Sequence, residues 1–127
     1  MFKRALEGNA NDSDAANQLG VLYVKQDRLD DARLWFQRAI SAQKDHSGAI
    51  NNLAVLYVKL GQPNDAIAAF QYGIDQAPGD RTLYMNLGRL YTQTGELEKA
   101  RQVMRRLLAQ IPNDPTALKA LQELESR

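Results

Sequence analysis

A chain of 127 residues is long enough for one folded domain, and its hydrophobic share of 44% is typical of globular proteins. The formal net charge of +1 provides no overall field to attract nucleic acid or an anionic membrane, so we expect neither as a partner. The sequence contains no cysteine, which excludes disulfides and thiolate chemistry and does not distinguish cytoplasm from periplasm. No apolar run is long enough to insert into a membrane.

In residues 1–12, Phe2 and Ala5 stand 34 positions before Phe36 and Ala39. This spacing predicts that the segment is the tail of a second helix from a preceding, partial repeat. An open face at that end would favour homo-association of copies end to end, because uncapped repeats expose apolar surface.

The next three segments, residues 13–46, 47–80 and 81–114, have equal lengths. In the first, Leu19, Leu22 and Tyr23 share one helix face, and Ala32 and Phe36 lie on a second stripe of the same spacing. The other two segments repeat this arrangement. Each segment therefore predicts two helices, and a short turn separates them.

Several positions recur with a period of 34 residues. They hold a leucine, a small residue, a tyrosine and an alanine: Leu19, Leu53 and Leu87; Gly20, Ala54 and Gly88; Tyr23, Tyr57 and Tyr91; Ala32, Ala66 and Ala100. Phe36 and Phe70 are followed by Met104, and Pro78 by Pro112. This pattern resembles the tetratricopeptide repeat (TPR) family. The resemblance implies a single all-α domain over residues 1–127, a right-handed superhelical solenoid of antiparallel helix pairs with three full TPR units.

Residues 115–127 are expected to form a C-terminal capping helix. Asp114 and Pro115 have the residue types of an N-cap and a first helical residue. Gln122 and Glu125 occupy the places of the small residue and the tyrosine. Polar residues there suit an outer face that meets water.

In TPR folds the first helices of successive units line a concave groove, and the resemblance implies the same here. The candidate peptide-binding residues are Asn17, Gln18, Val21, Val24, Asn51, Asn52, Val55, Val58, Lys59, Met85, Asn86 and Arg89. Asp14, Lys25, Thr82, Thr92 and Gln93 are expected on the same face. The third unit replaces two valines by Arg89 and Thr92, so we expect the groove to change from apolar to polar and cationic.

Gln18, Asn52 and Asn86 share one position, directly before the repeated leucine. An amide both donates and accepts, so each could hold one peptide unit of an extended partner. Helices about 8–10 Å apart would match about three extended residues per step, and some TPR superhelices have such an asparagine ladder. The alternative is that these amides cap helix packing or face water. We regard the amide as unnecessary for stacking and therefore as a candidate for function.

Another TPR site, the carboxylate clamp for chaperone tails, is disfavoured. Its pattern of Lys, Asn, Asn, Lys and Arg would fall on Asn17, Val21, Asn52, Thr82 and Asn86. Only Asn52 fits, and a buried carboxylate without cationic partners is costly.

The aromatic residues Trp35, Phe36 and Tyr72 are interpreted as packing between second helices, although a lone Trp can also anchor an interface. His46 stands alone and is interpreted as an ordinary loop residue.

Arg101, Arg105 and Arg106 are interpreted as solvated helix surface, since Glu96 and Glu98 lie near them in the sequence and no aromatic pattern for stacking accompanies them.

The sequence lacks the phosphate-binding, zinc-protease and serine-hydrolase motifs, so we expect no catalytic residue, cofactor or metal site. The leading hypothesis is a protein–protein interaction module, a scaffold or adaptor that binds a peptide segment or partner protein in its concave groove. One alternative is a structural spacer or self-assembly segment of a larger multi-repeat protein. A weaker alternative is the recruitment domain of an enzyme whose catalytic part lies outside this chain.

Overall fold

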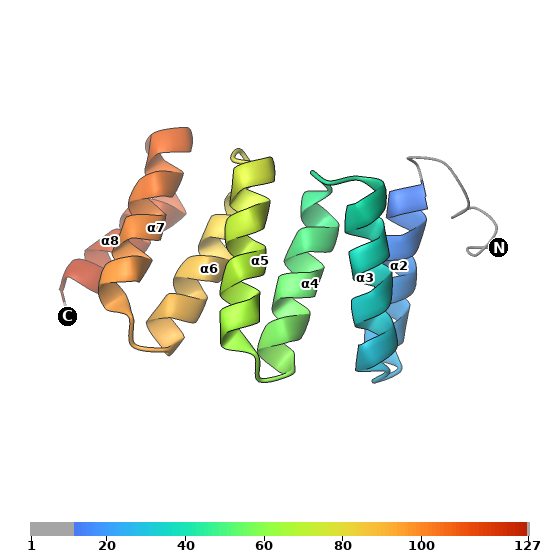
Figure 1. The fold of residues 1–127 in the computed structure, drawn as a ribbon. Helices are drawn as coiled ribbons and strands as arrows, with labels where there is room; N and C mark the ends of the chain where they lie inside the picture. Colours follow the sequence, from blue (N-terminus) through green and yellow to red (C-terminus); the bar gives the residue numbers. More distant parts are fainter. Residues whose placement is uncertain (1–11, 127) are drawn as a thin grey trace.

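The computed structural model describes residues 12–126, and within them every regular element is an α-helix (Figure 1). The helices are α2 (Asp12–Lys25), α3 (Leu29–Ala42), α4 (Ser47–Lys59), α5 (Pro63–Gln76), α6 (Arg81–Gln93), α7 (Leu97–Gln110) and α8 (Pro115–Glu125). The predicted all-α solenoid is confirmed. The predicted helix tail at residues 1–12 lies outside the described residues, except for Asp12, which begins α2.

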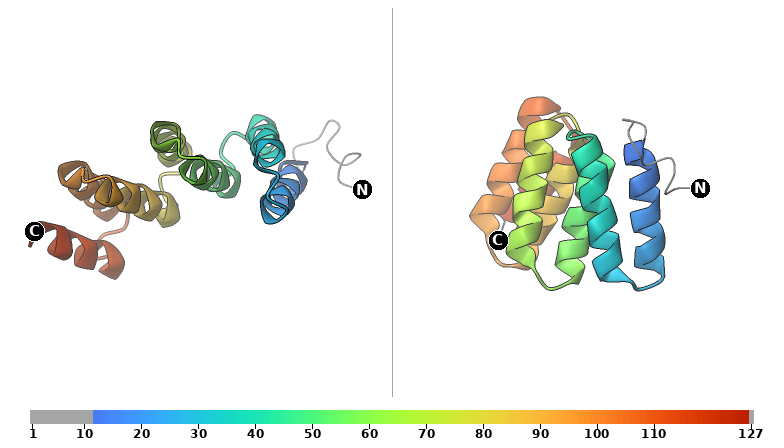
Figure 2. Two further views of the ribbon diagram at one scale, coloured as in Figure 1. Left: turned by 90° about the horizontal axis from the view of Figure 1, so that it is seen from below. Right: turned by 45° about the vertical axis from the view of Figure 1, so that its right-hand side comes forward.

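The helices form antiparallel pairs that stand side by side (Figures 1 and 2). The first helices are α2, α4, α6 and α8, and the second helices are α3, α5 and α7. Along the chain each helix packs on the next, and in addition α2 contacts α4 and α4 contacts α6. The first helices therefore form one continuous face, which we call the first-helix face.

The core is built from residues that recur at the same place in each pair. Ala32, Ala66 and Ala100 are completely buried, and Phe36, Phe70 and Met104 are at most 2% exposed. A β-carbon placed on Gly20 would come within 2.5 Å of the Phe36 ring, and one on Gly88 within 2.6 Å of the Met104 methyl group. A small residue on the first helix thus makes room for the large side chain of the second.

The helix ends also follow the period of the sequence. Gly61 and Gly95 have φ angles of 74° and 82°, and Asp27, at the matching place in the first pair, has a φ of 60°. Aspartate tolerates this left-handed conformation better than most residues. The sharp turn after the first helix is therefore kept although the glycine is not.

The described helix pairs α2–α3, α4–α5 and α6–α7 correspond to the three segments of the sequence, while the exact division into units of 34 residues stays a prediction. In α8, Gln122 and Glu125 are exposed, as expected for a capping helix, but Leu118 is also 47% exposed. Tyr84, one period earlier, is only 2% exposed. The outer face of α8 is therefore part polar and part apolar.

Within residues 12–126, no helix is long and apolar enough to cross a membrane. The same residues contain no cluster of His, Asp and Glu side chains suited to hold a metal ion.

Candidate functional site

Three hollows lie on the first-helix face, one between each pair of successive first helices. The α2–α4 hollow measures about 150 Å³, the α4–α6 hollow about 200 Å³ and the α6–α8 hollow about 270 Å³. Phe36, Phe70 and Met104 contribute to them in turn, one from each second helix. Because these three residues are one period apart, the hollows are repeated copies of one arrangement.

The walls of the hollows change along the chain. The α2–α4 hollow has Val21, Val24 and Val55 beside Asn52 and Lys59. The α4–α6 hollow keeps Val55 and Val58 but adds Asn86, Arg89 and Gln93. The α6–α8 hollow is lined by Met85, Arg89, Thr92, Gln93 and Glu123, among others.

Two cations on this face are not neutralised by the described part of the chain. Lys59 and Arg89 form no ion pair with any described carboxylate, and both are exposed. Arg89 lines two neighbouring hollows. An anionic group entering either hollow would therefore find an available guanidinium.

Amide pairs connect successive first helices beside the hollows. Asn52 Nδ2 donates to Asn17 Oδ1 at 2.9 Å, and Asn86 Nδ2 donates to Asn51 Oδ1 at 2.7 Å. We expected this amide to be unnecessary for stacking, but Asn52 and Asn86 each form a hydrogen bond between successive first helices. Each of the two keeps a carbonyl oxygen and a second N–H for other partners.

The predicted site residues fall into three groups. Nine of them line the hollows: Val21, Val24, Asn52, Val55, Val58, Lys59, Met85, Asn86 and Arg89. Asn17 and Asn51 accept the amide hydrogen bonds. Gln18 is exposed and takes part in neither arrangement among the described residues.

Sequence reasoning missed the contribution of α8. Ala120, Glu123 and Leu124 complete the α6–α8 hollow, although we expected this helix only to cap the fold. The sequence could have indicated this role, because Glu123 stands one period after Arg89 and two periods after Val55, both of which line hollows.

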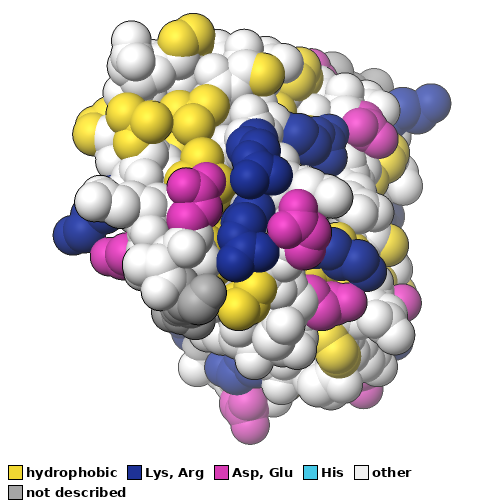
Figure 3. Space-filling model, turned by 90° about the vertical axis from the view of Figure 1, so that its left-hand side faces the viewer, with side chains coloured by type: hydrophobic (Ala, Val, Ile, Leu, Met, Phe, Trp, Pro, Cys, Tyr) yellow, Lys and Arg dark blue, Asp and Glu magenta, His cyan; other side chains and the backbone are white. Residues whose placement is uncertain are grey.

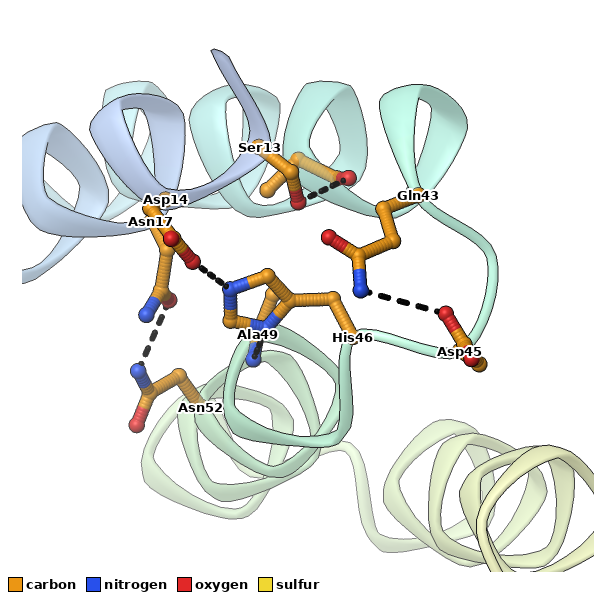
Figure 4. Close-up of polar contacts among 9 residues, drawn as sticks. Ser13, Asp14, Asn17, Gln43, Asp45, His46, Ala49 and Asn52 are labelled. Atoms are coloured by element: carbon orange, nitrogen blue, oxygen red, sulfur yellow. Dashed lines mark hydrogen bonds and ion pairs between the residues drawn. The ribbon is translucent and has the colours of Figure 1, made fainter. Parts of the chain in front are cut away.

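The interpretation of His46 as an ordinary loop residue is wrong. Its Nδ1 accepts the backbone N–H of Ala49 at 3.0 Å and so caps α4, and its Nε2 lies 2.6 Å from Asp14 Oδ1 (Figure 4). A ring nitrogen that accepts an N–H carries no proton, so Nε2 is the donor to Asp14. Asp14, which we expected on the groove face, contacts this histidine with one carboxylate oxygen and is still 81% exposed.

Asp114 occupies the matching cap of α8. It accepts backbone N–H groups of Thr116 and Ala117 at 3.0 and 3.1 Å. Arg81 donates to both of its carboxylate oxygens, at 2.8 and 3.1 Å. The Arg81 hydrogen bonds, followed by that from Ala117, lower the pKa of Asp114 to about 2, and the same pair raises the pKa of Arg81.

Of the three arginines of α7, Arg106 is exposed, as interpreted, whereas Arg101 and Arg105 are not simply solvated. Arg101 donates to Leu124 O at 2.9 Å and to Glu98 at 3.1 Å, so it joins α7 to α8. Arg105 lies within 3.8 Å of Glu98 and Glu125. At this end of the molecule Lys and Arg side chains alternate with Asp and Glu (Figure 3), which is not the uninterrupted basic surface that nucleic acid requires.

The aromatic residues are divided between core and surface. Phe36 is buried, as interpreted, whereas Trp35 and Tyr72 are half-buried. Trp35 packs near three buried alanines of α2, α3 and α4, with the Arg38 guanidinium 4.6 Å from its ring centre. Tyr72 donates its hydroxyl to the backbone oxygen of Lys44.

Several solved structures share this fold. The first TPR domain of Spaghetti (RPAP3), described as bound to the HSP90 peptide SRMEEVD, has a TM-score of 0.76 at 19% identity over 94% of this chain and 97% of its own. MamA has a TM-score of 0.75 at 20% identity over 98% of this chain and 73% of its own. The Yersinia enterocolitica type III secretion chaperone SycD, in complex with a peptide of the translocator YopD, has a TM-score of 0.74 at 18% identity over 89% and 92%. No curated protein sequence gives a significant match.

Family models give the more direct assignment. Three models described as tetratricopeptide repeat match residues 57–124, 1–47 and 35–68. The first alone covers more than half of the sequence, and it spans Phe70 and Met104, which are buried and line two of the hollows. The chain belongs to the tetratricopeptide repeat family.

Proposed function

We propose that this chain is a protein–protein interaction module that holds an extended peptide segment across its first-helix face. The observation that carries the proposal is the series of hollows repeated in phase along that face, each lined in part by side chains that its own fold leaves exposed. Two of the similar structures are described as peptide complexes. These descriptions support peptide binding as a use of this fold.

The walls suggest how such a peptide would lie. Apolar side chains of the peptide would enter beside Val21, Val24 and Val55, where burial of each methylene contributes about 0.8 kcal/mol. The remaining polar atoms of Asn52 and Asn86 would pair with the peptide backbone. Hydrogen bonds of this kind contribute only about 0.5–1.5 kcal/mol each, so the apolar contacts would supply most of the affinity.

A peptide library displayed on phage and selected on the folded chain would test this proposal. The affinity of selected peptides is then measured by fluorescence anisotropy for the wild type and for Val55→Glu. Val55 is 46% exposed and lines two hollows, so the substitution should leave the fold intact and weaken binding by about tenfold or more.

Leu34→Glu is the matched control, because Leu34 is 53% exposed on α3, a second helix, and lines none of the hollows on the first-helix face. It should leave peptide affinity unchanged. Selected peptides that bind Val55→Glu as tightly as the wild type would show that the first-helix face is not the binding surface.

One observation favours the alternative of a self-assembling segment. Leu22 is 44% exposed, whereas Leu56 and Leu90, one and two periods later, are 2% and 5% exposed. Leu56 packs in a cluster with Ala32 and Phe36 of α3, and no described helix covers Leu22 in this way. In this alternative a second copy would cover Leu22, and sedimentation velocity should show association that Leu22→Lys abolishes. A wild-type chain that stays monomeric at high concentration contradicts it.

The recruitment domain of an enzyme remains a third prediction, for which the full-length reading frame is the test. Such a role would use the same peptide-binding face and would need no catalytic residue here.

A further inference from the structure

A fourth hollow lies on the other side of the molecule, between the second helices α3 and α5. It measures about 340 Å³, and α4, visible between α3 and α5 in Figure 1, forms its floor. Ile40, Ile50, Leu53 and the ring of Tyr57 give it an apolar interior. We call it the outer hollow.

The repeated tyrosines differ in whether a cation lies over the aromatic ring. Tyr23, Tyr57 and Tyr91 occupy the same place in successive first helices. The Arg28 guanidinium lies 4.7 Å from the ring centre of Tyr23, and the Lys99 ammonium lies 5.8 Å from that of Tyr91. Among residues 12–126 no cation lies over the ring of Tyr57.

The rings of Tyr57 and Tyr91 are held by equivalent hydrogen bonds. Gln37 donates to the Tyr57 hydroxyl at 3.5 Å, and Gln71, one period later, donates to the Tyr91 hydroxyl at 3.3 Å. Tyr91 is only 5% exposed, while Tyr57 is half-buried. The face of Tyr57 is therefore the more open of the two.

An acidic residue stands where the third pair has its cation. Asp65 stands one period before Lys99, lines the outer hollow and forms no ion pair with any described residue. A carboxylate beside an aromatic face gives a cation two favourable partners, the ring quadrupole and the opposite charge.

Small side chains on α5 leave space for a ligand. Ala68 and Ala69 line the outer hollow, whereas Gln102 and Val103 occupy the matching places on α7. Val103 is 4% exposed and so fills its position. Alanine at these two places therefore leaves more of the hollow, about 340 Å³ in all, for the methylene stem of a long side chain.

We propose that the outer hollow binds a lysine or arginine side chain of a partner protein, with its cation over the Tyr57 ring and beside the Asp65 carboxylate. Its methylene groups lie against Ile40 and Ala69. This surface faces away from the first-helix face, so the chain carries a second docking point for a basic segment, independent of peptide binding in the first three hollows.

The test uses N-acetyl-arginine amide as the probe and N-acetyl-citrulline amide as its uncharged isostere. Each is titrated to tens of millimolar against the ¹⁵N-labelled chain, and amide shifts are followed by NMR. Arginine should give saturable shifts around Asp65 and Ala69 and should bind about three- to thirtyfold more tightly than citrulline, the range expected for a cation–π contact with an exposed ion pair.

Two substitutions copy the matching residues of the third pair. Asp65→Lys supplies the cation that Lys99 provides there, and Ala69→Val fills the space as Val103 does. Each should abolish saturable binding of the arginine probe, and Asp65→Asn, which keeps the Tyr57 ring, should reduce its affinity to a value between those of arginine and citrulline for the wild type. Val55→Glu, which alters only the first-helix face, should leave it unchanged, whatever happens to peptide binding.

Equal binding of arginine and citrulline would overturn the proposal, as would wild-type binding of arginine by Asp65→Lys. Arginine shifts confined to the first-helix face, or no saturable shifts in the wild type, would overturn it equally.

Discussion

At the first junction between helix pairs, His46 caps α4 and donates to Asp14 of the preceding first helix. At the last junction, Asp114 caps α8 and accepts from Arg81 of the preceding first helix. The two cap residues are two periods apart, so the same place in the fold carries a histidine that donates and an aspartate that accepts. The cap therefore keeps its place in the repeat, while the direction of its cross-repeat contact is reversed and the partner, Arg81, stands one position before the equivalent of Asp14.

The reversal changes how strongly each junction is held. At the last junction the Asp114 side chain is 4% exposed and makes four hydrogen bonds, two of them to a guanidinium. At the first junction Asp14 is 81% exposed, and a contact open to water contributes less. At the middle junction the cap residue is Asp80 of α6, for which no cross-repeat partner is found among the described residues.

The largest effect is expected from Asp114→Ala. The substitution removes the cap of α8 and leaves Arg81 without its carboxylate, so the melting temperature should fall by roughly 5–10 °C. Hydrogen exchange should show faster opening of α8. Asp80→Ala, which removes a cap that has no cross-repeat arginine, is the matched control and should lower the melting temperature less. Equal losses for the two variants would show that the Arg81 contact contributes nothing.

Acid should weaken the last junction through the same carboxylate. The pKa of Asp114 is lowered from 3.8 to about 2 by the Arg81 hydrogen bonds and then by that from Ala117. Its contribution is fully present above its unfolded pKa and is lost as the pH falls through the folded pKa. Asp114→Asn keeps an acceptor for the cap but has no charge. The stability difference between wild type and this variant should therefore shrink between pH 4 and 2, and a constant difference contradicts the assignment.

The amide pairs should contribute less than the Asp114 junction. Asn52→Ala and Asn86→Ala each remove one inter-helix hydrogen bond, and each should lower the melting temperature by roughly 2–5 °C. From the sequence alone we regarded these amides as unnecessary for stacking, and the observed pairs change that expectation. Gln18→Ala is the control, since Gln18 forms no such pair. An unchanged melting temperature in both asparagine variants would mean that these bonds merely replace bonds to water.

The period of the sequence was sufficient to predict the helix pairs, because burial fixes residue types at Leu19, Ala32 and Phe36 and their equivalents. It also indicated most of the hollow-lining residues. The amide pairs were missed because they join residues 35 positions apart, Asn17 to Asn52 and Asn51 to Asn86, while the comparison used only the period of 34.

His46 was misread for a different reason. Histidine is not a usual N-cap residue, so its type carried no signal by itself. Its position within the repeat did carry a signal, because Asp80 and Asp114 follow at one and two periods and both are N-caps. Residue type identifies an N-cap only when the residue is a usual cap, such as aspartate. Position in the repeat identifies the cap for aspartate and histidine alike.

The smallest effect is expected when the first junction is given the cap of the last. In His46→Asp the new carboxylate can still accept the Ala49 N–H, so α4 should remain capped. It would face Asp14 instead of donating to it, and this repulsion should lower the melting temperature by roughly 1–3 °C at low salt.

His46→Asp combined with Asp14→Asn separates the two contributions. Removing the second negative charge should recover the loss caused by repulsion, and added salt should recover it in the single variant, because exposed charges are screened. A loss that persists in the double variant and at high salt would mean that aspartate cannot cap α4 in this position. The cap itself, rather than the contact with Asp14, would then be what His46 contributes to the first junction.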